Sequence, residues 1–257
     1  MKLRFPSLTR NAAKQPAHKA SVPEGQRIYA IGDIHGRADL LGQMFDMIVK
    51  DLHSSSVATP MCIFLGDYVD RGSDSRGVLN LLTVRDFPQS FVSLRGNHET
   101  LMLSFLSNPK EFEVWRNNGG IETLHSYGID VSKFRRGQEV EKVAEEFKVT
   151  LPPAHLNFLQ QTRLSLSIGD YFFCHAGIRP GRALENQTEE DLTWIRDEFL
   201  SSERDHGKVV IHGHTPVLEP DVRPNRINID TGAYISGKFT AVVLEGEDRR
   251  FLSTGSS

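Results

Sequence analysis

Five short apolar segments of this chain each end in a glycine-containing motif with aspartate, asparagine or histidine. Mostly apolar segments of this length, bounded by glycine, predict strands that are buried on both faces. The five predicted strands span residues 27–31, 61–65, 90–94, 171–173 and 209–211. We expect the polar side chains that follow them to meet at the same edge of one sheet, where open α/β sheets bind ligands.

The motifs contain residue types that bind metal ions and phosphate. A single Asp-x-His is commonly a turn, and a single histidine commonly lies in a core. Each motif alone is therefore weak evidence for a binding site. Their joint occurrence, each after a predicted buried strand, favours one shared site. The motifs are Gly-Asp-Ile-His-Gly (32–36), Gly-Asp-Tyr-Val-Asp-Arg-Gly (66–72), Gly-Asn-His-Glu (96–99), Cys-His-Ala-Gly (174–177) and Gly-His-Thr-Pro (213–216).

Helical and strand patterns alternate in the first part of the chain. Residues 38–52 and 75–84 have apolar side chains at helical spacing between the predicted strands. This alternation predicts an α/β protein with a largely parallel sheet. Residues 100–163 predict a helical insertion that overhangs the site, and strand patterns return from residue 164 onward, which suits a second sheet packed on the first.

The ends of the chain differ in character from its middle. We expect a flexible basic N-terminal tail over residues 1–25, a catalytic domain over 26–246 and a polar C-terminal tail over 247–257. The net charge of -3 gives no global reason to expect a nucleic-acid partner. No apolar run approaches the roughly 20 residues that span a bilayer. With two cysteines inside or beside predicted strands, we expect a soluble, cytoplasmic protein without disulfides.

The residue types predict a centre with two metal ions. Two ions a few ångströms apart need ligands from both sides and an anionic bridge, and Asp67, at the end of the second strand, is the natural bridge. No cysteine belongs to the set, so a structural thiolate zinc site is excluded. Mixed carboxylate, amide and imidazole donors suit manganese, iron, zinc or cobalt. The candidate ligands are Asp33, His35, Asp67, Asn97, His175 and His214.

A pair of metal ions lowers the pKa of a bridging water and holds a phosphoryl group during in-line displacement. The leaving oxygen then needs a proton, which His98, beside Asn97, is placed to donate. Asp70 would orient His98, as a carboxylate does for a catalytic imidazole. Arg71 and a second arginine would bind the non-bridging phosphate oxygens in a fork geometry that lysine does not match.

The motifs at 32–36, 66–72 and 96–99 match without substitution the signatures of the metal-dependent phosphoprotein phosphatases, a family within the calcineurin-like metallophosphoesterases. The resemblance covers about residues 27–244, and the later motifs look most like the compact bacterial and phage serine/threonine protein phosphatases. It implies a β-sandwich of two mixed sheets flanked by helices, with the helical insertion and a dinuclear centre at the sheet edge.

The resemblance also implies roles for individual residues. Asp33 and His35 would hold one metal ion, the later three ligands would hold the other, and Asp67 would be shared. The ions would be manganese, with iron or zinc as alternatives. His98 would be the general acid with Asp70 behind it. The expected substrate-binding residues are Arg71, Arg196 and Asn97.

Four further positions refine this picture. The second phosphate-binding arginine of the family follows a tryptophan, and Arg196 after Trp194 is the best match. Tyr234 is a further candidate, since family members often have an aromatic residue near the site. We interpret His212 as a strand residue behind the site. Pro216 stands where many phosphodiesterases of the wider superfamily have another histidine ligand, and this departure favours monoester hydrolysis.

The expected function is that of a serine/threonine protein phosphatase, in which a metal-bridging hydroxide attacks phosphoserine or phosphothreonine directly. Phosphotyrosine is a further possible substrate, the partner would be a phosphorylated protein or peptide, and we expect a monomer. The alternative is a symmetrical diadenosine tetraphosphate hydrolase, which shares His-Ala-Gly-Ile (175–178) but usually has Gly-Asn-His-Asp. Glu99 and the Tyr-Val-Asp of residues 68–70 favour the phosphatase. A metal-binding scaffold without turnover would have no use for the proton donor His98.

Overall fold

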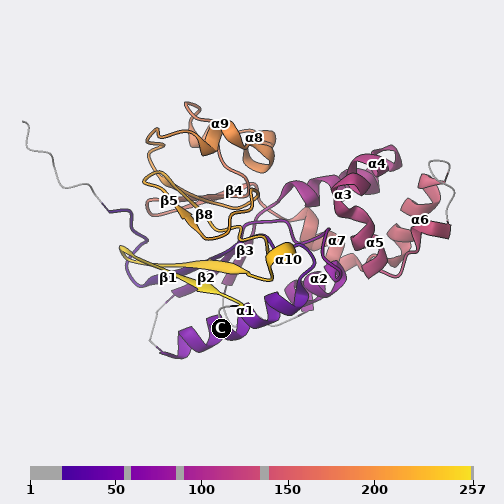
Figure 1. The fold of residues 1–257 in the computed structure, drawn as a ribbon, viewed down its shortest axis with the longest axis horizontal. Helices are drawn as coiled ribbons and strands as arrows, with labels where there is room; N and C mark the ends of the chain where they lie inside the picture. The colour runs from indigo at the N-terminus through magenta and orange to yellow at the C-terminus, as the bar shows by residue number, and fades with distance from the viewer. Residues whose placement is uncertain (1–18, 55–58, 85–89, 134–138, 256–257) are drawn as a thin grey trace, which may run out of the picture.

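Two five-stranded β-sheets stack face to face in the computed structural model of the chain (Figure 1). The structure describes residues 19–54, 59–84, 90–133 and 139–255. Helices cover the outer face of each sheet, and a separate group of helices extends from one end of the sandwich (Figure 1). This is the α/β sandwich with a helical insertion that the sequence predicts.

The first sheet has the strand order β10-β9-β1-β2-β3. Strands β1, β2 and β3 are parallel, and β9 and β10 extend the sheet with antiparallel pairing at the β1 edge. The helices α1 (Ala38–Ser54) and α2 (Ser75–Val84) connect the parallel strands and begin at the predicted residues. The strands are β1 (Gln26–Ile31), β2 (Thr59–Phe64), β3 (Ser90–Ser93), β9 (Thr240–Glu245) and β10 (Asp248–Ser253).

The second sheet has the strand order β4-β5-β6-β8-β7, in which β5, β6 and β8 are parallel. The expectation that all five motif strands share one sheet is wrong, because β5 and β6 belong to this second sheet. Apolar strands that are buried on both faces look alike in sequence whichever sheet they join. The strands are β4 (Ser165–Ile168), β5 (Tyr171–Cys174), β6 (Val209–His212), β7 (Asp221–Val222) and β8 (Arg226–Asn228).

Alternate side chains of β1 pack into two different hydrophobic cores. Ile28 and Ala30 lie in the core between the sheets, whereas Tyr29 and Ile31 pack against the helices. All four side chains are fully buried. Burial of this kind contributes about 1.5–3 kcal/mol for each large apolar side chain. Because both faces of the strand are apolar, the polar residues that follow it are confined to the sheet edge.

The helical insertion follows the third motif, whose last three residues form the first turn of α3, and it ends before β4. A five-residue π-helical turn, Arg116–Gly120, joins α4 to α5. Figure 1 shows these helices as a lobe beside the sandwich, while α8 (Glu189–Trp194) and α9 (Asp197–Leu200) cover the second sheet. The helices of the lobe are α3 (Asn97–Ser107), α4 (Phe112–Trp115), α5 (Ile121–Ser126), α6 (Val140–Thr150) and α7 (Pro153–Gln160).

Parts of both predicted tails belong to the fold. Asp248–Ser253 forms β10, which pairs along the whole of β9, so most of the predicted polar tail is an edge strand. Residues 1–18 of the predicted N-terminal tail lie outside the described residues. Val22, however, is buried in the core between the sheets, and its N–H donates to the carbonyl of Gly246 at 3.0 Å. Among the described residues, no helix is both long and apolar enough to cross a bilayer.

Deleting residues 247–257 should lower the free energy of unfolding by about 2 kcal/mol or more, because Phe251 and Leu252 pack on the two cores. Denaturant unfolding followed by circular dichroism measures the change. A chain that lacks only residues 256–257 is the control. If the two truncated proteins unfold at the same denaturant concentration, β10 contributes nothing to the fold.

Candidate metal centre

The five motifs meet where the carboxyl ends of strands from both sheets come together. Two groups of buried residues have candidate ligand atoms within 4.8 Å of one another: His35, Asp67 and His98 form one, and Asp67, His175 and His214 form the other. Asp67 is common to both groups, as a bridging ligand has to be. The helix α10 (Ala233–Ser236) brings Tyr234 to the same place.

The donor atoms converge on the Oδ2 atom of Asp67. It lies 3.3 Å from Nε2 of His35 and 3.4 Å from Nε2 of His175. Nε2 of His175 in turn lies 3.1 Å from Oδ1 of Asn97 and 3.2 Å from Nδ1 of His214. Donor atoms 3.1 to 3.4 Å apart are spaced as ligands of one divalent cation are.

The histidine rings are oriented as metal ligands usually are. His35 donates its Nδ1–H to the carbonyl of Val69 at 3.0 Å, and His175 donates its Nδ1–H to the carbonyl of Leu65 at 3.1 Å. In both rings the Nε2 atom therefore faces the site, and it offers a lone pair when the ring is neutral. Hydrogen bonds of this kind fix the tautomer and the ring plane of metal-ligating histidines.

Three buried polar atoms at the site have no hydrogen-bond partner among the described residues: Oδ1 of Asp33, Nε2 of His98 and Nε2 of His214. Asp33 lies outside both ligand groups, but its Oδ2 accepts a hydrogen bond from the backbone N–H of His214 at 2.9 Å. Unpaired buried polar atoms are costly and need an explanation. A bound divalent cation would supply a partner for Oδ1 of Asp33, so this carboxylate fits such a centre.

The charges of the site are strongly coupled. Burial alone would raise the pKa of Asp67, but His175 and His98 hold that pKa well below its usual range. Burial would lower the pKa of His175, but Asp67 and Asp33 raise it to about 9. Burial and the neighbouring Asp230 raise the pKa of Asp33 well above its usual range. A bound cation stabilises such carboxylates as anions and displaces the proton from a ligating imidazole.

Backbone strain is concentrated at the site. In the described ranges, the non-glycine residues with left-handed backbone have φ between 45° and 71°, and all of them are residues that the sequence assigns to the site. L-residues rarely adopt this conformation, and where they do it often marks a functional position. Neither the composition nor the hydrophobic periodicity of the sequence indicates this backbone strain. The residues are His35, Asp67, Asp70, Arg71 and His214.

Glu99, for which the sequence gives no site role, organises the loops after β2 and β3. Its Oε2 accepts hydrogen bonds from the backbone N–H groups of Asp67 at 2.9 Å and Gly96 at 2.8 Å. Its Oε1 accepts from Tyr68 at 2.7 Å and Val69 at 3.4 Å. Burial and the charge of Asp67 raise the pKa of Glu99 to about 7, against the effect of the Gly96 N–H.

The same two loops approach so closely that they require glycine. A Cβ atom at Gly66 would lie 2.5 Å from the backbone nitrogen of Gly96, and a Cβ at Gly96 would lie 2.1 Å from Oδ1 of Asp67. Gly66 also has φ of 113°, which favours glycine. The glycines of the second and third motifs are therefore needed to bring Asp67 beside Asn97 and His98.

His98 and Asp70 form a buried pair beside the ligands. Nδ1 of His98 lies 2.8 Å from Oδ2 of Asp70, and Nε2 of His98 lies 3.9 Å from Oδ2 of Asp67. The helical insertion adds two donors to Asp70 that the sequence does not reveal: the indole of Trp115 and the hydroxyl of Thr123. They lie 45 and 53 residues from Asp70, and no local motif marks them.

The arginines lie at the rim of the site. Nη1 of Arg71 donates to the hydroxyl of Tyr234 at 3.0 Å, and its guanidinium lies 5.1 Å from the centre of the Tyr234 ring. That ring is 5.1 Å from the ring of His35, so Tyr234 does approach the site. Arg196 is exposed and donates to Oγ1 of Thr215 at 3.1 Å, beside the fifth motif. His212 lies outside both ligand groups, in β6.

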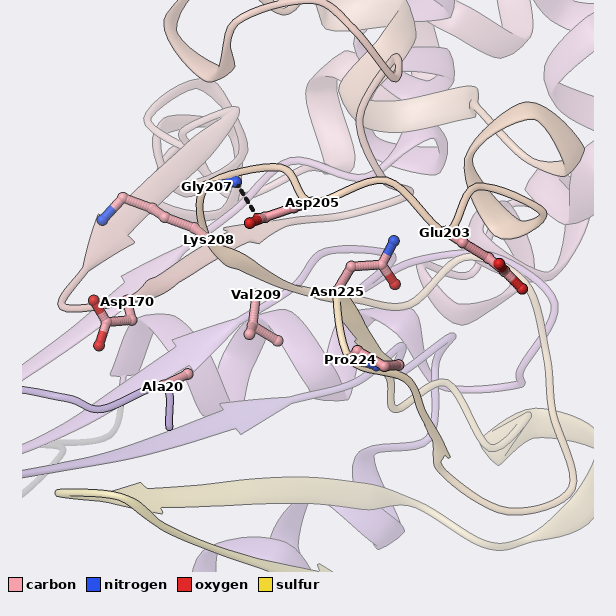
Figure 2. Close-up of a pocket in the computed structure, with 9 residues that line it drawn as sticks. All are labelled: Ala20, Asp170, Glu203, Asp205, Gly207, Lys208, Val209, Pro224 and Asn225. Carbon is pink, nitrogen blue, oxygen red and sulfur yellow. Dashed lines mark hydrogen bonds between the residues drawn. The ribbon is translucent and has the colours of Figure 1, made fainter. Parts of the chain in front are cut away.

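A separate cavity of about 440 Å³ lies at the other end of the second sheet (Figure 2). Asp170, Lys208 and Val209, at or before the amino ends of β5 and β6, line it. Asp205 at its wall accepts a hydrogen bond from the N–H of Gly207 at 2.8 Å. None of the predicted site residues lines this cavity, so it is not part of the metal centre.

A family model of calcineurin-like phosphoesterases matches residues 26–245. The chain belongs to this family. The match spans both sheets except β10 and includes all five motifs. This calcineurin-like phosphoesterase is therefore, in general terms, a hydrolase of phosphoesters that binds divalent metal ions.

Two kinds of relative are similar over most of the chain. The asymmetrical bis(5'-nucleosyl)-tetraphosphatase PrpE of Oceanobacillus iheyensis is 25% identical over 248 residues, which cover 90% of this chain and 92% of that protein. Serine/threonine-protein phosphatase 2 of Salmonella typhimurium is 27% identical over 224 residues, which cover 84% of this chain and 91% of that protein. These two relatives are named for different substrates.

Solved structures agree with the fold. The structure of a candidate diadenosine tetraphosphatase has a TM-score of 0.63 and 20% identity, and the likeness covers 95% of this chain and 97% of that chain. A cold-active protein tyrosine phosphatase has a TM-score of 0.54 and 16% identity, with 93% and 84% covered. At these identities the likeness shows the fold alone.

Replacing Asp67 by alanine should remove metal binding, because this carboxylate belongs to both ligand groups. Metal content after manganese loading and gel filtration measures the change. Asp39→Ala is the matched control, since Asp39 lies near the first motif but is largely exposed and paired with Arg37. If Asp67→Ala retains as much metal as the wild-type chain, Asp67 does not bridge the centre.

Proposed function

We propose that the chain is a metal-dependent phosphomonoesterase that hydrolyses phosphoserine and phosphothreonine in proteins. The observation that supports this most is the His98–Asp70 pair, in which Nδ1 is held at 2.8 Å and Nε2 is buried without a partner. A serine or threonine alkoxide is a poor leaving group, so its departure requires a proton donor. The leaving group of a phosphoanhydride is itself acidic and needs that proton far less.

Each residue then has a defined task. Two divalent ions held by Asp33, His35, Asp67, Asn97, His175 and His214 would supply an activated water and neutralise phosphate charge. Arg71, fixed by Tyr234, would bind one side of the phosphate and Arg196 the other, with Asn97 also close to it. His98 would give its proton to the leaving oxygen, while Asp70 keeps the ring in the required orientation.

We propose manganese as the native metal, with iron and zinc as alternatives, since the donors are a mixture of oxygen and imidazole nitrogen. The substrate partner would be a phosphorylated protein or peptide. An open rim suits a substrate of that size, because Arg196 and Trp194 are exposed there.

Hydrolysis of dinucleoside tetraphosphates is the second candidate function. The relatives that are named as asymmetrical bis(5'-nucleosyl)-tetraphosphatases favour it, as they match 82% to 90% of the chain. The same metal ligands would serve that reaction. The products separate the two modes of cleavage: symmetrical hydrolysis of diadenosine tetraphosphate gives two ADP, and asymmetrical hydrolysis gives ATP and AMP.

A direct comparison tests the proposal. Manganese-loaded protein is given a phosphoserine peptide or diadenosine tetraphosphate, each with and without a chelator. We expect chelator-sensitive phosphate release from the peptide at a kcat/KM above that for the dinucleotide. Faster formation of ADP, or of ATP and AMP, would assign the chain to dinucleotide hydrolysis. No turnover of either substrate would contradict both functions.

Replacing His98 by alanine should lower kcat on the phosphoserine peptide by about 10²- to 10⁴-fold, the range for loss of a general acid. Metal content should not change, because the predicted ligands remain. His125→Ala is the control, since His125 is an exposed histidine of the insertion without a site contact. Unchanged turnover in His98→Ala would exclude His98 as the proton donor.

A further inference from the structure

The carboxylate of Asp70 is fully buried and accepts hydrogen bonds from three side chains. Nδ1 of His98 lies 2.8 Å from Oδ2, and the hydroxyl of Thr123 donates to Oδ1 at 2.6 Å. The indole N–H of Trp115 lies 2.9 Å from Oδ2 and 3.1 Å from Oδ1. Two of the three donors therefore come from the helical insertion, outside all five motifs.

The indole contacts both oxygens of this carboxylate. Because its N–H is shared between both oxygens, it fixes the plane in which the carboxylate lies, and that plane sets the direction of the hydrogen bond to His98. The hydroxyl of Thr123 also accepts from the backbone N–H of Asp70 at 2.9 Å, which holds the residue from a second side. A buried carboxylate that loses one donor must turn toward another or remain unsatisfied.

Trp115 itself has little freedom to move. Its fully buried ring stacks between Phe105, at 4.9 Å, and Phe147, at 5.8 Å. A Cβ atom at Gly120 would lie 2.5 Å from the ring, so the backbone also presses against it. Interiors packed in this way hold side chains in single rotamers. The insertion thus forms a rigid support for Asp70.

The same segment contacts the neighbouring arginine. The carbonyl of Gly119 accepts a hydrogen bond from the backbone N–H of Arg71 at 3.2 Å, and Gly119 has the left-handed φ of 97°. A Cβ at Gly119 would lie 2.8 Å from the Cγ atom of Arg71. The π-helical turn therefore holds the main chain of the residue that follows Asp70, so the insertion braces this motif at two successive positions.

We propose that Trp115 is a positioning residue for the proton donor His98, which it orients through Asp70, and that Thr123 shares this task. This inference rests on the proposed function, in which His98 protonates the leaving oxygen. Loss of the indole N–H should then slow only reactions whose leaving group needs a proton. A purely structural role would slow all substrates alike.

The test is Trp115→Phe, which removes the N–H and keeps an aromatic ring between Phe105 and Phe147. Its kcat is measured on phenyl phosphate, whose leaving group needs protonation, and on dinitrophenyl phosphate, whose leaving group does not. We expect a loss of about 10- to 100-fold on phenyl phosphate and less than about threefold on dinitrophenyl phosphate. Metal content and KM should remain as in the wild-type chain.

Matched variants separate the possible causes. Tyr127→Phe removes another buried hydrogen bond of the insertion, to Nδ1 of His155 at 2.7 Å, and should leave the ratio of the two rates unchanged. Thr123→Val should shift the ratio in the same direction as Trp115→Phe. In an Asp70→Asn background, Trp115→Phe should have no further effect on the ratio, because residues that act as one unit are not additive.

Equal losses on both phosphates in Trp115→Phe and Thr123→Val, or no loss on either, would overturn the inference. His98→Ala distinguishes this failure from a failure of the proposed function. If His98→Ala slows phenyl phosphate selectively and the insertion variants do not, only the positioning role of Trp115 is wrong. If His98→Ala itself slows both phosphates equally, His98 is not the proton donor and both proposals fail.

Discussion

The carboxylate of Glu99 is the contact on which the candidate site depends. It accepts the backbone N–H groups of Asp67, Tyr68, Val69 and Gly96, and so joins the loops that follow two neighbouring strands. This leaves Asp67 in a left-handed conformation with its own carboxylate turned to the histidines. Burying the carboxylate of Glu99 is costly unless its oxygens accept hydrogen bonds. Four backbone N–H groups donate to the Glu99 carboxylate. These hydrogen bonds help to hold Asp67 in its strained left-handed conformation.

The two sheets and the insertion contribute different parts of the chemistry. The first sheet supplies Asp33, His35 and Asp67 at the ends of β1 and β2, and the second sheet supplies His175 and His214. The insertion supplies two of the three side-chain donors to Asp70, from Trp115 and Thr123. Relatives with two different names are similar in sequence over most of the chain. In the proposed function, His98 and the groups that hold Asp70 would favour phosphomonoesters, whose leaving group needs a proton.

Much of the fold could be predicted from the sequence, because apolar runs and helical spacing are local signals. These signals predict α1, α2 and the strands that precede the motifs. Because the candidate ligands follow strand ends, the sequence also predicts that Asp67, His175 and His214 lie together. Local signals could not assign β5 and β6 to a second sheet, and the charged residues of β10 resemble a tail. The contacts of Trp115 and Thr123 with Asp70 depend on how the insertion folds back. No spacing rule encodes them.

The most direct measurement of the central claim is anomalous diffraction at the manganese absorption edge from crystals of the manganese-loaded protein. We expect two anomalous peaks per chain on either side of the Asp67 carboxylate, separated by roughly 3.5–4 Å. One peak should contact His35 and Asp33, and the other should contact Asn97, His175 and His214. A single peak, or two peaks without Asp67 between them, would contradict the dinuclear centre and the mechanism built on it.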